Sequence, residues 1–384
     1  MGRVLMWSGI TLAGMVVIVA VLGGVVYLAT GPEDPPAGSP SAMFLEADTY
    51  DIGEVERTFV DVTRPTPANG DYPGADSRTL VTSIWYPKLE GASPLVIYSH
   101  GFMSDRFGGR YLAEALAGRG YIVAAADFPL SNRNAPGGPN AADVVNQPGD
   151  VSFLIDSLLA LEGSENPFPG SIDPSRIGVA GLSLGGLTAT LVGYHPRLKD
   201  DRVRAVVSIA GPAALFTRRF FLTSQAPFLM IAGTEDAVVD YETHAAGIPS
   251  RAPQATLLTI RGASHTAFVD LADPALRFMD HPDSLACEAL LAGGEAGGEE
   301  DPEDPFAGLG DAADGINPAG TRLAICTKPL GKTIHPGRQH LITQVAVLSF
   351  FSAQFAANAE GRQTARERLR AAMPKDFPEV SVTF

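Results

Sequence analysis

A serine between two glycines is the residue pattern with the clearest chemical meaning in this chain, Gly181-Leu182-Ser183-Leu184-Gly185. An apolar run, RIGVA, precedes it and an apolar helical segment follows it. A sharp turn from strand to helix lifts a serine hydroxyl above the sheet, and the glycines relieve crowding in that turn. The helix N-terminus also favours the negative charge that develops during acyl transfer. This context predicts a nucleophile rather than a serine capping an ordinary glycine-rich turn.

A histidine must activate such a serine, because the hydroxyl is a weak nucleophile without a base. His265 ends the sequence Gly-Ala-Ser-His, which directly follows the last predicted core strand at 255–260. In the chain order Ser, Asp, His, a loop in this position reaches back over the serine. His100 precedes the nucleophile, and His195 and His244 fall in predicted helices. We therefore predict His265 as the base.

The acid that orients this histidine should follow a strand between the serine and the histidine. Asp236 lies three residues beyond the glycine that closes the predicted strand 227–233. A carboxylate there can accept the Nδ1 proton of His265 and fix its tautomer. Glu235 and Asp240 are the rivals, and Asp240 is also placed to cap the helix that follows it. We predict Asp236 as the acid.

An oxyanion formed at the serine needs two backbone donors. The first is the N–H of the residue after the nucleophile, Leu184, and the second comes from the loop after an earlier strand, here 94–100. Gly101 lets that loop turn close to the substrate, which makes the Phe102 N–H the second predicted donor. His100, at the end of the strand, is predicted to support the loop.

Short apolar runs alternate with helical segments through the body of the chain. Several runs are continuous in Val, Ile, Leu and Ala, which is typical of strands covered on both faces. Strand followed by helix, repeated, predicts an α/β fold with a mostly parallel central sheet and helices on both faces. The predicted strands are 57–62, 79–87, 94–100, 121–129, 176–183, 203–211, 227–233 and 255–260, and the predicted helices are 109–119, 149–162, 184–195, 241–248 and 339–357.

The composition excludes several classes of protein. The chain has 384 residues, of which 45% are hydrophobic and 18% charged, so it can bury a large core. A net charge of −15 would repel a phosphate backbone, so we expect no nucleic-acid partner. The acidic residues Asp301, Glu303 and Asp304 lack the spacing of a calcium-binding loop, and we predict no metal site.

The N-terminal segment is long and apolar, with no charged side chain in residues 4–31. About 20 apolar residues cross a bilayer core, whereas a secretory h-region is usually about 7–15 residues long. Residues 1–31 are predicted to be a transmembrane anchor, with the membrane as partner through 4–31, or alternatively a cleaved signal segment. Arg3 before it, and Glu33 and Asp34 after it, favour export of the rest, either anchored or secreted.

The rest of the chain divides into a Pro-rich linker at 32–48 and one domain at 49–384, with an acidic surface insertion at about 281–338. Cys287 and Cys326 bracket the most acidic part of that insertion. In an oxidising compartment, a lone pair of cysteines most simply forms one disulfide. We therefore predict a disulfide between them.

Together the motifs SHGF, GLSLGG, GTEDAVV and GASH resemble the α/β-hydrolase superfamily, over about 50–270 and 339–357. Within it they look like two branches, the platelet-activating-factor acetylhydrolase and dienelactone-hydrolase-like group and the cutinase-like polyester hydrolases and lipases. The resemblance implies the α/β-hydrolase fold and serine ester hydrolysis without a cofactor. Two features depart from the pattern: dienelactone hydrolases proper usually carry cysteine where this chain has Ser183, and compact polyester hydrolases lack the acidic insertion.

The sequence thus predicts a serine carboxylic ester hydrolase that works through an acyl-enzyme on a small-molecule, lipid or polymer ester. Acyl transfer or amide hydrolysis by the same three residues is the alternative, followed by a binding protein without catalysis. Phe102, Phe128, Leu184 and Phe268 either line an apolar substrate pocket or belong to the core.

Overall fold

The computed structural model describes residues 30–292, 305–317 and 324–384. Its contacts separate Met1–Asp34 from Pro35–Phe384, and the account below concerns the second unit. The predicted anchor or signal segment lies outside the described residues except at its end, and so do the acidic residues 301–304. No helix in the described ranges combines the length and apolar character needed to cross a membrane.

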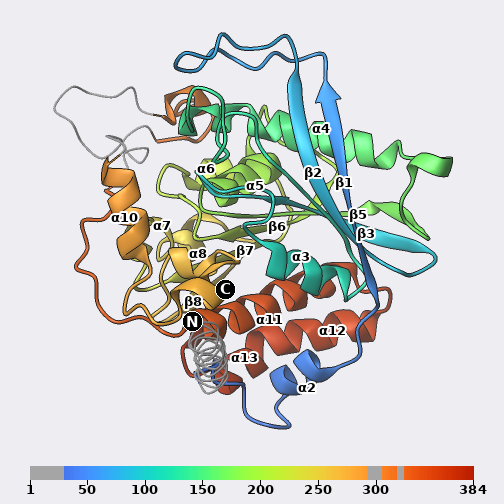
Figure 1. Cartoon of the computed structure of the whole chain (residues 1–384). Helices are drawn as coiled ribbons and strands as arrows, with labels where there is room; N and C mark the ends of the chain where they lie inside the picture. Colours follow the sequence, from blue (N-terminus) through green and yellow to red (C-terminus); the bar gives the residue numbers. More distant parts are fainter. Residues whose placement is uncertain (1–29, 293–304, 318–323) are drawn as a thin grey trace, which may run out of the picture. The chain divides into compact units, whose positions relative to one another are not determined.

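A nine-stranded sheet forms the centre of the described part of the chain (Figure 1). Its spatial order is β1-β2-β4-β3-β5-β6-β7-β8-β9. The strands from β4 to β8 pair in parallel, whereas β1, β2 and β9 join antiparallel at the two sides. The strand bounds are β1 Ile52–Asp61, β2 Arg78–Pro87, β3 Ala92–Ser99, β4 Ile122–Ala126, β5 Ser171–Leu182, β6 Val203–Ile209, β7 Phe228–Gly233, β8 Ala255–Ile260 and β9 Val380–Thr383.

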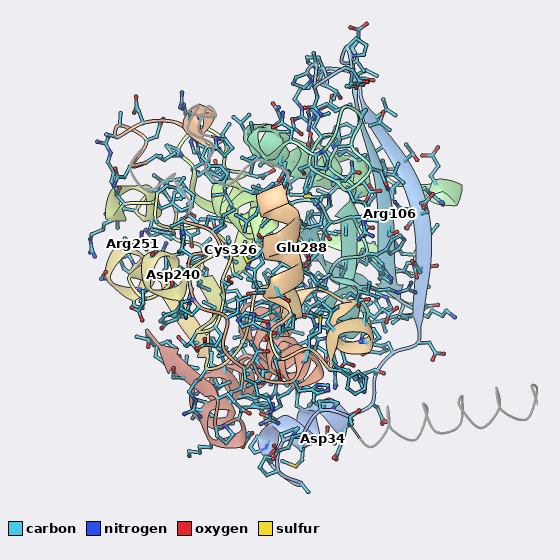
Figure 2. The ribbon with its side chains drawn as sticks, turned by 60° about the vertical axis from the view of Figure 1, so that its left-hand side comes forward. Asp34, Arg106, Asp240, Arg251, Glu288 and Cys326 are labelled. Carbon is cyan, nitrogen blue, oxygen red and sulfur yellow. A yellow bond between two sulfur atoms is a disulfide. The ribbon has the colours of Figure 1, made fainter. Side chains whose placement is uncertain are left out.

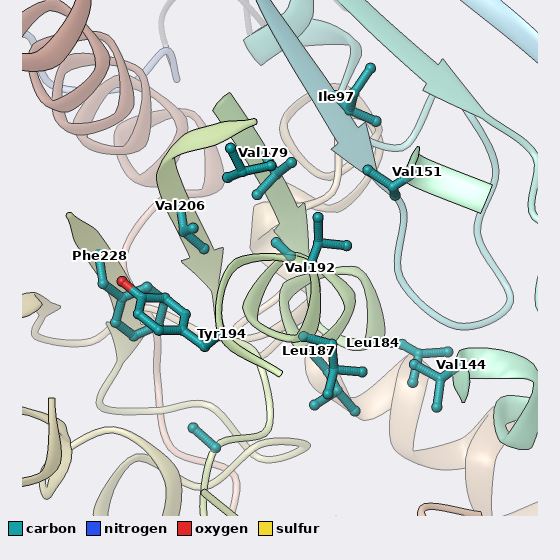
Figure 3. Packing of buried hydrophobic residues seen from close by; sticks show 14 of the residues in the cluster. Ile97, Val144, Val151, Val179, Leu184, Leu187, Val192, Tyr194, Val206 and Phe228 are labelled. Carbon is teal, nitrogen blue, oxygen red and sulfur yellow. The ribbon is translucent and has the colours of Figure 1, made fainter. Parts of the chain in front are cut away.

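Helices cover both faces of the sheet, as the continuous apolar strands predict. One apolar cluster packs α4 and α5 against one face, and a second packs α3 and α11 against the other (Figure 1). Leu187 and Val192 of α5 pack with Val179 and Val206 of the neighbouring strands (Figure 3). The helix bounds are α2 Pro40–Glu46, α3 Arg110–Ala117, α4 Gln147–Leu159, α5 Leu184–Tyr194, α6 Arg218–Phe221, α7 Tyr241–His244, α8 Ile248–Arg251, α9 Ala272–Leu276, α10 Asp283–Ala292, α11 Pro336–Phe355, α12 Ala359–Glu367 and α13 Met373–Asp376.

Several segments differ from the sequence-based expectation, among them the helices α6, α9, α10, α12 and α13, which were not predicted. The predicted helix 241–248 is two short helices, α7 and α8, because Gly247 and the proline after Ile248 interrupt it. Part of the predicted linker 32–48 is the helix α2, whose Ser41 backbone N–H donates to Asp376 of α13 at 2.9 Å. Strand β9 was not predicted, since its few residues carry no distinctive pattern.

The predicted disulfide between Cys287 and Cys326 is present, with 5.6 Å between the Cα atoms. It joins α10 to the segment that precedes α11 (Figure 2). Within the predicted insertion, most of the described residues 305–317 are exposed, but the apolar side chains of Phe306, Leu309 and Ile316 are buried in the core. These apolar side chains anchor an otherwise acidic stretch.

A buried group of charges lies beside β2 and α4. The Arg78 guanidinium, fully buried, forms ion pairs with Asp143 at 2.8 Å and Asp150 at 2.7 Å. Arg64 also reaches Asp150 at 2.7 Å and Asp61 at 2.7 Å. Three buried carboxylates and two guanidinium groups satisfy one another, which is the condition for keeping charges inside a protein.

Candidate active site

The predicted nucleophile Ser183 stands at the turn between β5 and α5. Its backbone has a φ of +56°, a conformation that costs energy for any residue with a Cβ atom. Its N–H donates to the Ile209 carbonyl of β6 at 2.8 Å, which holds the turn against the neighbouring strand. At Gly185 an added Cβ would collide with the Ser99 carbonyl oxygen of β3, so the turn needs glycine there. This geometry lifts the Ser183 side chain, half-buried, at the end of the strand.

Asp236 and His265 form a buried hydrogen-bonded pair. The loop after β7 carries Asp236, and the loop after β8 carries His265. His265 Nδ1 lies 2.8 Å from Asp236 Oδ2, and the other carboxylate oxygen accepts the N–H groups of Val238 at 2.9 Å and Val239 at 2.6 Å. The carboxylate therefore cannot rotate without losing three bonds. Its orientation favours the tautomer in which His265 Nδ1 carries the proton and Nε2 is free to accept one.

Electrostatics within the pair favour a charged imidazole. Burial of His265 disfavours its protonated form, but Coulomb attraction to Asp236 and Asp283 and the hydrogen bond that His265 donates to Asp236 raise its pKa above the usual value. Burial raises the pKa of Asp236, and Asp283 adds to that effect while His265 opposes it. An imidazole held in this way is a stronger base than a solvated one.

Ser183, Asp236 and His265 follow β5, β7 and β8, which run parallel, so all three stand at the carboxyl edge of the sheet. Ser183 Oγ and His265 Nε2 make no hydrogen bond to each other in the structure. Neither atom has another hydrogen-bond partner within the described ranges. Catalytic hydrogen bonds of this type often close only when substrate is bound.

The two predicted oxyanion donors belong to segments next to Ser183. An added Cβ at Gly101 would lie 3.3 Å from the Ser183 Cβ atom, so the loop after β3 runs directly past the serine. Neither the Phe102 N–H nor the Leu184 N–H has an acceptor among the described residues. Leu184 is the first residue of α5, where backbone N–H groups are unpaired by helix geometry. Both N–H groups are therefore unpaired among the described residues.

His100 fastens the loop that carries Gly101 and Phe102. Its Nε2 accepts the Phe128 N–H at 3.1 Å, so the proton is on Nδ1, which lies 2.7 Å from the Gly101 carbonyl oxygen. Complete burial lowers its pKa and keeps the ring neutral. The ring joins the ends of β3 and β4, as a supporting residue would.

The other acids and histidines considered for catalysis make contacts that hold the structure together. Asp240 caps α7, accepting the Thr243 N–H at 2.9 Å, and Glu235 lies 3.9 Å from Lys328. His244 Nδ1 accepts two backbone N–H groups, and burial lowers its pKa to about 4. Within the described ranges, no group of three or more His, Cys, Asp or Glu side chains could hold a metal ion. The side chains of Phe128, Leu184 and Phe268 are buried in the core, whereas Phe102 is half-buried and packs against it.

Sequence reasoning missed Asp283, the first residue of α10. Its carboxylate, fully buried, accepts the backbone N–H of Ala237 at 3.0 Å, of His265 at 3.0 Å and of Thr266 at 2.6 Å. It thus touches both the loop of Asp236 and the loop of His265. An aspartate after His-Pro at a helix start looks like an ordinary cap, so no signal in the sequence singles it out.

Comparisons with known proteins identify the fold. No family model matches the chain, and no curated protein matches it. Among solved structures, it is similar to a ferulic acid esterase from Streptomyces cinnamoneus, with a TM-score of 0.55 and 20% identical residues over 87% of this chain and 96% of that one. With the mostly parallel sheet and the helices on both faces, this similarity shows that the chain has an α/β-hydrolase fold.

Proposed function

We propose that this protein is a serine hydrolase of carboxylic esters that works through an acyl-enzyme. The observation that carries the proposal is the 2.8 Å contact between His265 Nδ1 and Asp236 Oδ2, at the sheet edge where the strained turn presents Ser183. Strain at a serine is retained where the surrounding structure and function require it. The solved neighbour's description as an esterase supports the same class of reaction.

The proposed reaction begins when Ser183 Oγ attacks the ester carbonyl carbon and His265 Nε2 takes the hydroxyl proton. The carbonyl oxygen becomes an oxyanion that accepts the Phe102 and Leu184 N–H groups, while Asp236 stabilises the imidazolium. Collapse of the tetrahedral intermediate breaks the ester C–O bond, and His265 returns the proton to the departing alcohol. Water then attacks the acyl-enzyme, with His265 as base, and releases the acid.

We also propose that the enzyme works outside the cytoplasm, anchored by or cleaved from its apolar N-terminal segment. The disulfide between Cys287 and Cys326 supports this proposal, because disulfides form and persist mainly in oxidising compartments.

The substrate class is proposed only as a carboxylic ester. The sequence leaves the substrate open between small-molecule, lipid and polymer esters, and the solved neighbour is described as a ferulic acid esterase. Phe102, which is half-buried, contributes its backbone N–H to the proposed oxyanion site, and its ring is the aromatic group that we expect an acyl or aryl group to meet. A panel of esters should therefore include methyl ferulate beside p-nitrophenyl esters of two to sixteen carbons.

Hydrolysis by the full chain, purified without reducing agent, tests the proposal. We expect turnover of at least one ester, and a loss of kcat by about 10⁶-fold on Ser183→Ala, as when a catalytic serine is removed from other serine hydrolases. Gly247→Ala is the control, because its added Cβ meets only the Arg251 side chain, at 3.5 Å. Equal rates for wild type and Ser183→Ala would overturn the proposal, and so would a folded wild type inert on the whole panel.

A further inference from the structure

We propose that Asp283 is a positioning residue that fixes the distance between the catalytic acid and the catalytic base, and that the disulfide holds Asp283 in place. This inference rests on the proposed function. It adds to the site a fourth side chain, which comes from α10 rather than from a loop after a core strand.

The first argument is the direction of the Asp283 hydrogen bonds. An aspartate at a helix start usually accepts N–H groups of its own first turn. Asp283 instead accepts N–H groups from two other loops, at residue 237 and at residues 265 and 266. No bond from its carboxylate to its own helix occurs within the described ranges. The side chain therefore links two loops rather than capping α10.

The second argument is which peptide groups are linked. The Ala237 N–H belongs to the peptide that directly follows Asp236, and the second N–H is that of His265 itself. Both are bound by the same oxygen, Asp283 Oδ2, at 3.0 Å. One atom thus sets the separation of the two backbones whose side chains meet at 2.8 Å. A displacement of about 1 Å at a catalytic group can cost about 10²-fold in rate.

The third argument is that both sides of residue 237 are held by the disulfide-linked segments. The Ala237 N–H donates to Asp283, four residues before Cys287, and the Ala237 carbonyl oxygen accepts the N–H of Cys326 at 2.6 Å. The bond between Cys287 and Cys326 ties these two contacts together. The loop that carries Asp236 is therefore hydrogen-bonded to both segments that the disulfide joins, α10 and the segment around Cys326. Displacement of α10 would break its hydrogen bond to this loop.

The fourth argument is charge. Two carboxylates raise the pKa of His265: Asp236, from the loop after β7, and Asp283, from α10. The Asp283 carboxylate is fully buried, where a charge acts more strongly than in water. It therefore stabilises the imidazolium that forms when Ser183 attacks. Removing this charge should lower the pKa of His265.

The variant Asp283→Asn tests the inference, with Asp240→Asn as the matched control. Each removes one carboxylate that accepts backbone N–H groups, but among the described residues the hydrogen bonds of the Asp240 carboxylate go to Thr243 of its own helix. In Asp283→Asn we expect kcat to fall by about 10- to 100-fold with little change in KM, and the acid limb of kcat/KM to move to lower pH. Asp240→Asn should leave kcat and the limb unchanged.

A purely structural role for Asp283 would lower stability without moving the acid limb, and that outcome would overturn the inference, as would an unchanged kcat. If Asp283→Asn does not fold, Asp283→Glu tests the same position. It keeps the charge and displaces the carboxylate by one methylene group, so kcat should fall while the acid limb stays in place. A Glu variant with wild-type kcat would contradict the proposed positioning.

A readout without turnover separates this inference from the proposed function. Titration of ¹⁵N-labelled histidine by NMR gives the pKa of His265 directly, with His265→Gln used to assign its signal. If wild type hydrolyses no ester, the proposed function fails, yet a lower pKa of His265 in Asp283→Asn would still support the link between Asp283 and the pair. An unchanged pKa would remove the electrostatic part of the inference.

Discussion

The two halves of the proposed active site are held in different ways. Ser183 and its turn are held by neighbours in the sheet, since its N–H binds Ile209 of the adjacent strand and Gly185 abuts Ser99 of the other adjacent strand. Asp236 and His265 are held together by Asp283, a residue 46 positions beyond Ala237 and 18 beyond His265. The nucleophile half is built from the fold itself, and the acid–base half depends on an added segment.

This difference indicates where each half is vulnerable. Disrupting the turn at Ser183 requires moving packed strands, which costs the energy of the core. Releasing the acid–base half requires breaking only a few hydrogen bonds and one disulfide. We therefore expect a substitution at the hydrogen-bonded acid to lower activity with little loss of stability. A substitution in the packed turn should instead lower stability, with activity falling as the turn distorts.

Within the acid–base half, the largest effect is expected from Asp236→Asn. The asparagine carbonyl oxygen can still accept the Val238 and Val239 N–H groups, but its NH₂ group faces His265 Nδ1 and favours the wrong tautomer. We expect kcat to fall by about 10⁴-fold with little change in stability. Steady-state kinetics and urea unfolding check this expectation. Glu235→Gln is the control, and an equal loss there would point to Glu235 as the acid.

The second prediction concerns the anchor of that half. Replacing both Cys287 and Cys326 by serine opens a loop with a sequence separation of 39 residues. The chain-entropy model gives a loss of about 4 kcal/mol in the free energy of unfolding. Urea unfolding measures this loss of free energy. Kinetics on the folded fraction should show a reduced kcat, because the two segments that hydrogen-bond Ala237 are no longer joined. An unchanged kcat in the folded variant would show that α10 stays in place without the bond.

The smallest of these effects is expected in the nucleophile half, from Gly185→Ala. Its added Cβ would collide with the Ser99 carbonyl oxygen, which the sheet holds in place. We expect a loss of about 3 kcal/mol in the free energy of unfolding, with activity falling as the turn distorts. Unfolding by urea, beside the harmless Gly247→Ala, gives the comparison. A stable and active Gly185→Ala would contradict a turn fixed by packing.

Much of the nucleophile half can be predicted from the sequence, because its causes are local. The continuous apolar runs predict strands buried on both faces, and the glycines around Ser183 indicate a crowded turn that the structure contains. The fold class follows from the alternation of such runs with helices, and the observed sheet confirms it. The roles of Ser183, His265 and Asp236 in catalysis remain predictions that kinetics must test.

The acid–base half is less predictable, because its support comes from contacts distant in sequence. Asp283 and Ala237 share a hydrogen bond across 46 residues, and no periodicity reports such a pair. Phe306 and Leu309 are buried in the core, but the acidic composition of the stretch around them predicts a surface segment, so the sequence did not indicate their burial. Strand β9 joins the sheet through backbone pairing with β8, and its few side chains do not indicate this pairing in the sequence.

The buried charges around Arg78 have a consequence for how the sequence can change over generations. Replacing Arg78 by an uncharged residue would leave Asp143 and Asp150 as buried carboxylates with one less partner, which costs several kcal/mol. Replacing either carboxylate alone would leave the guanidinium underpaired. A protein with only one of these residues replaced is poorly stable, so we expect the three positions to be substituted together in evolution or not at all. In a set of distant relatives, the three positions should therefore be either all charged or all apolar.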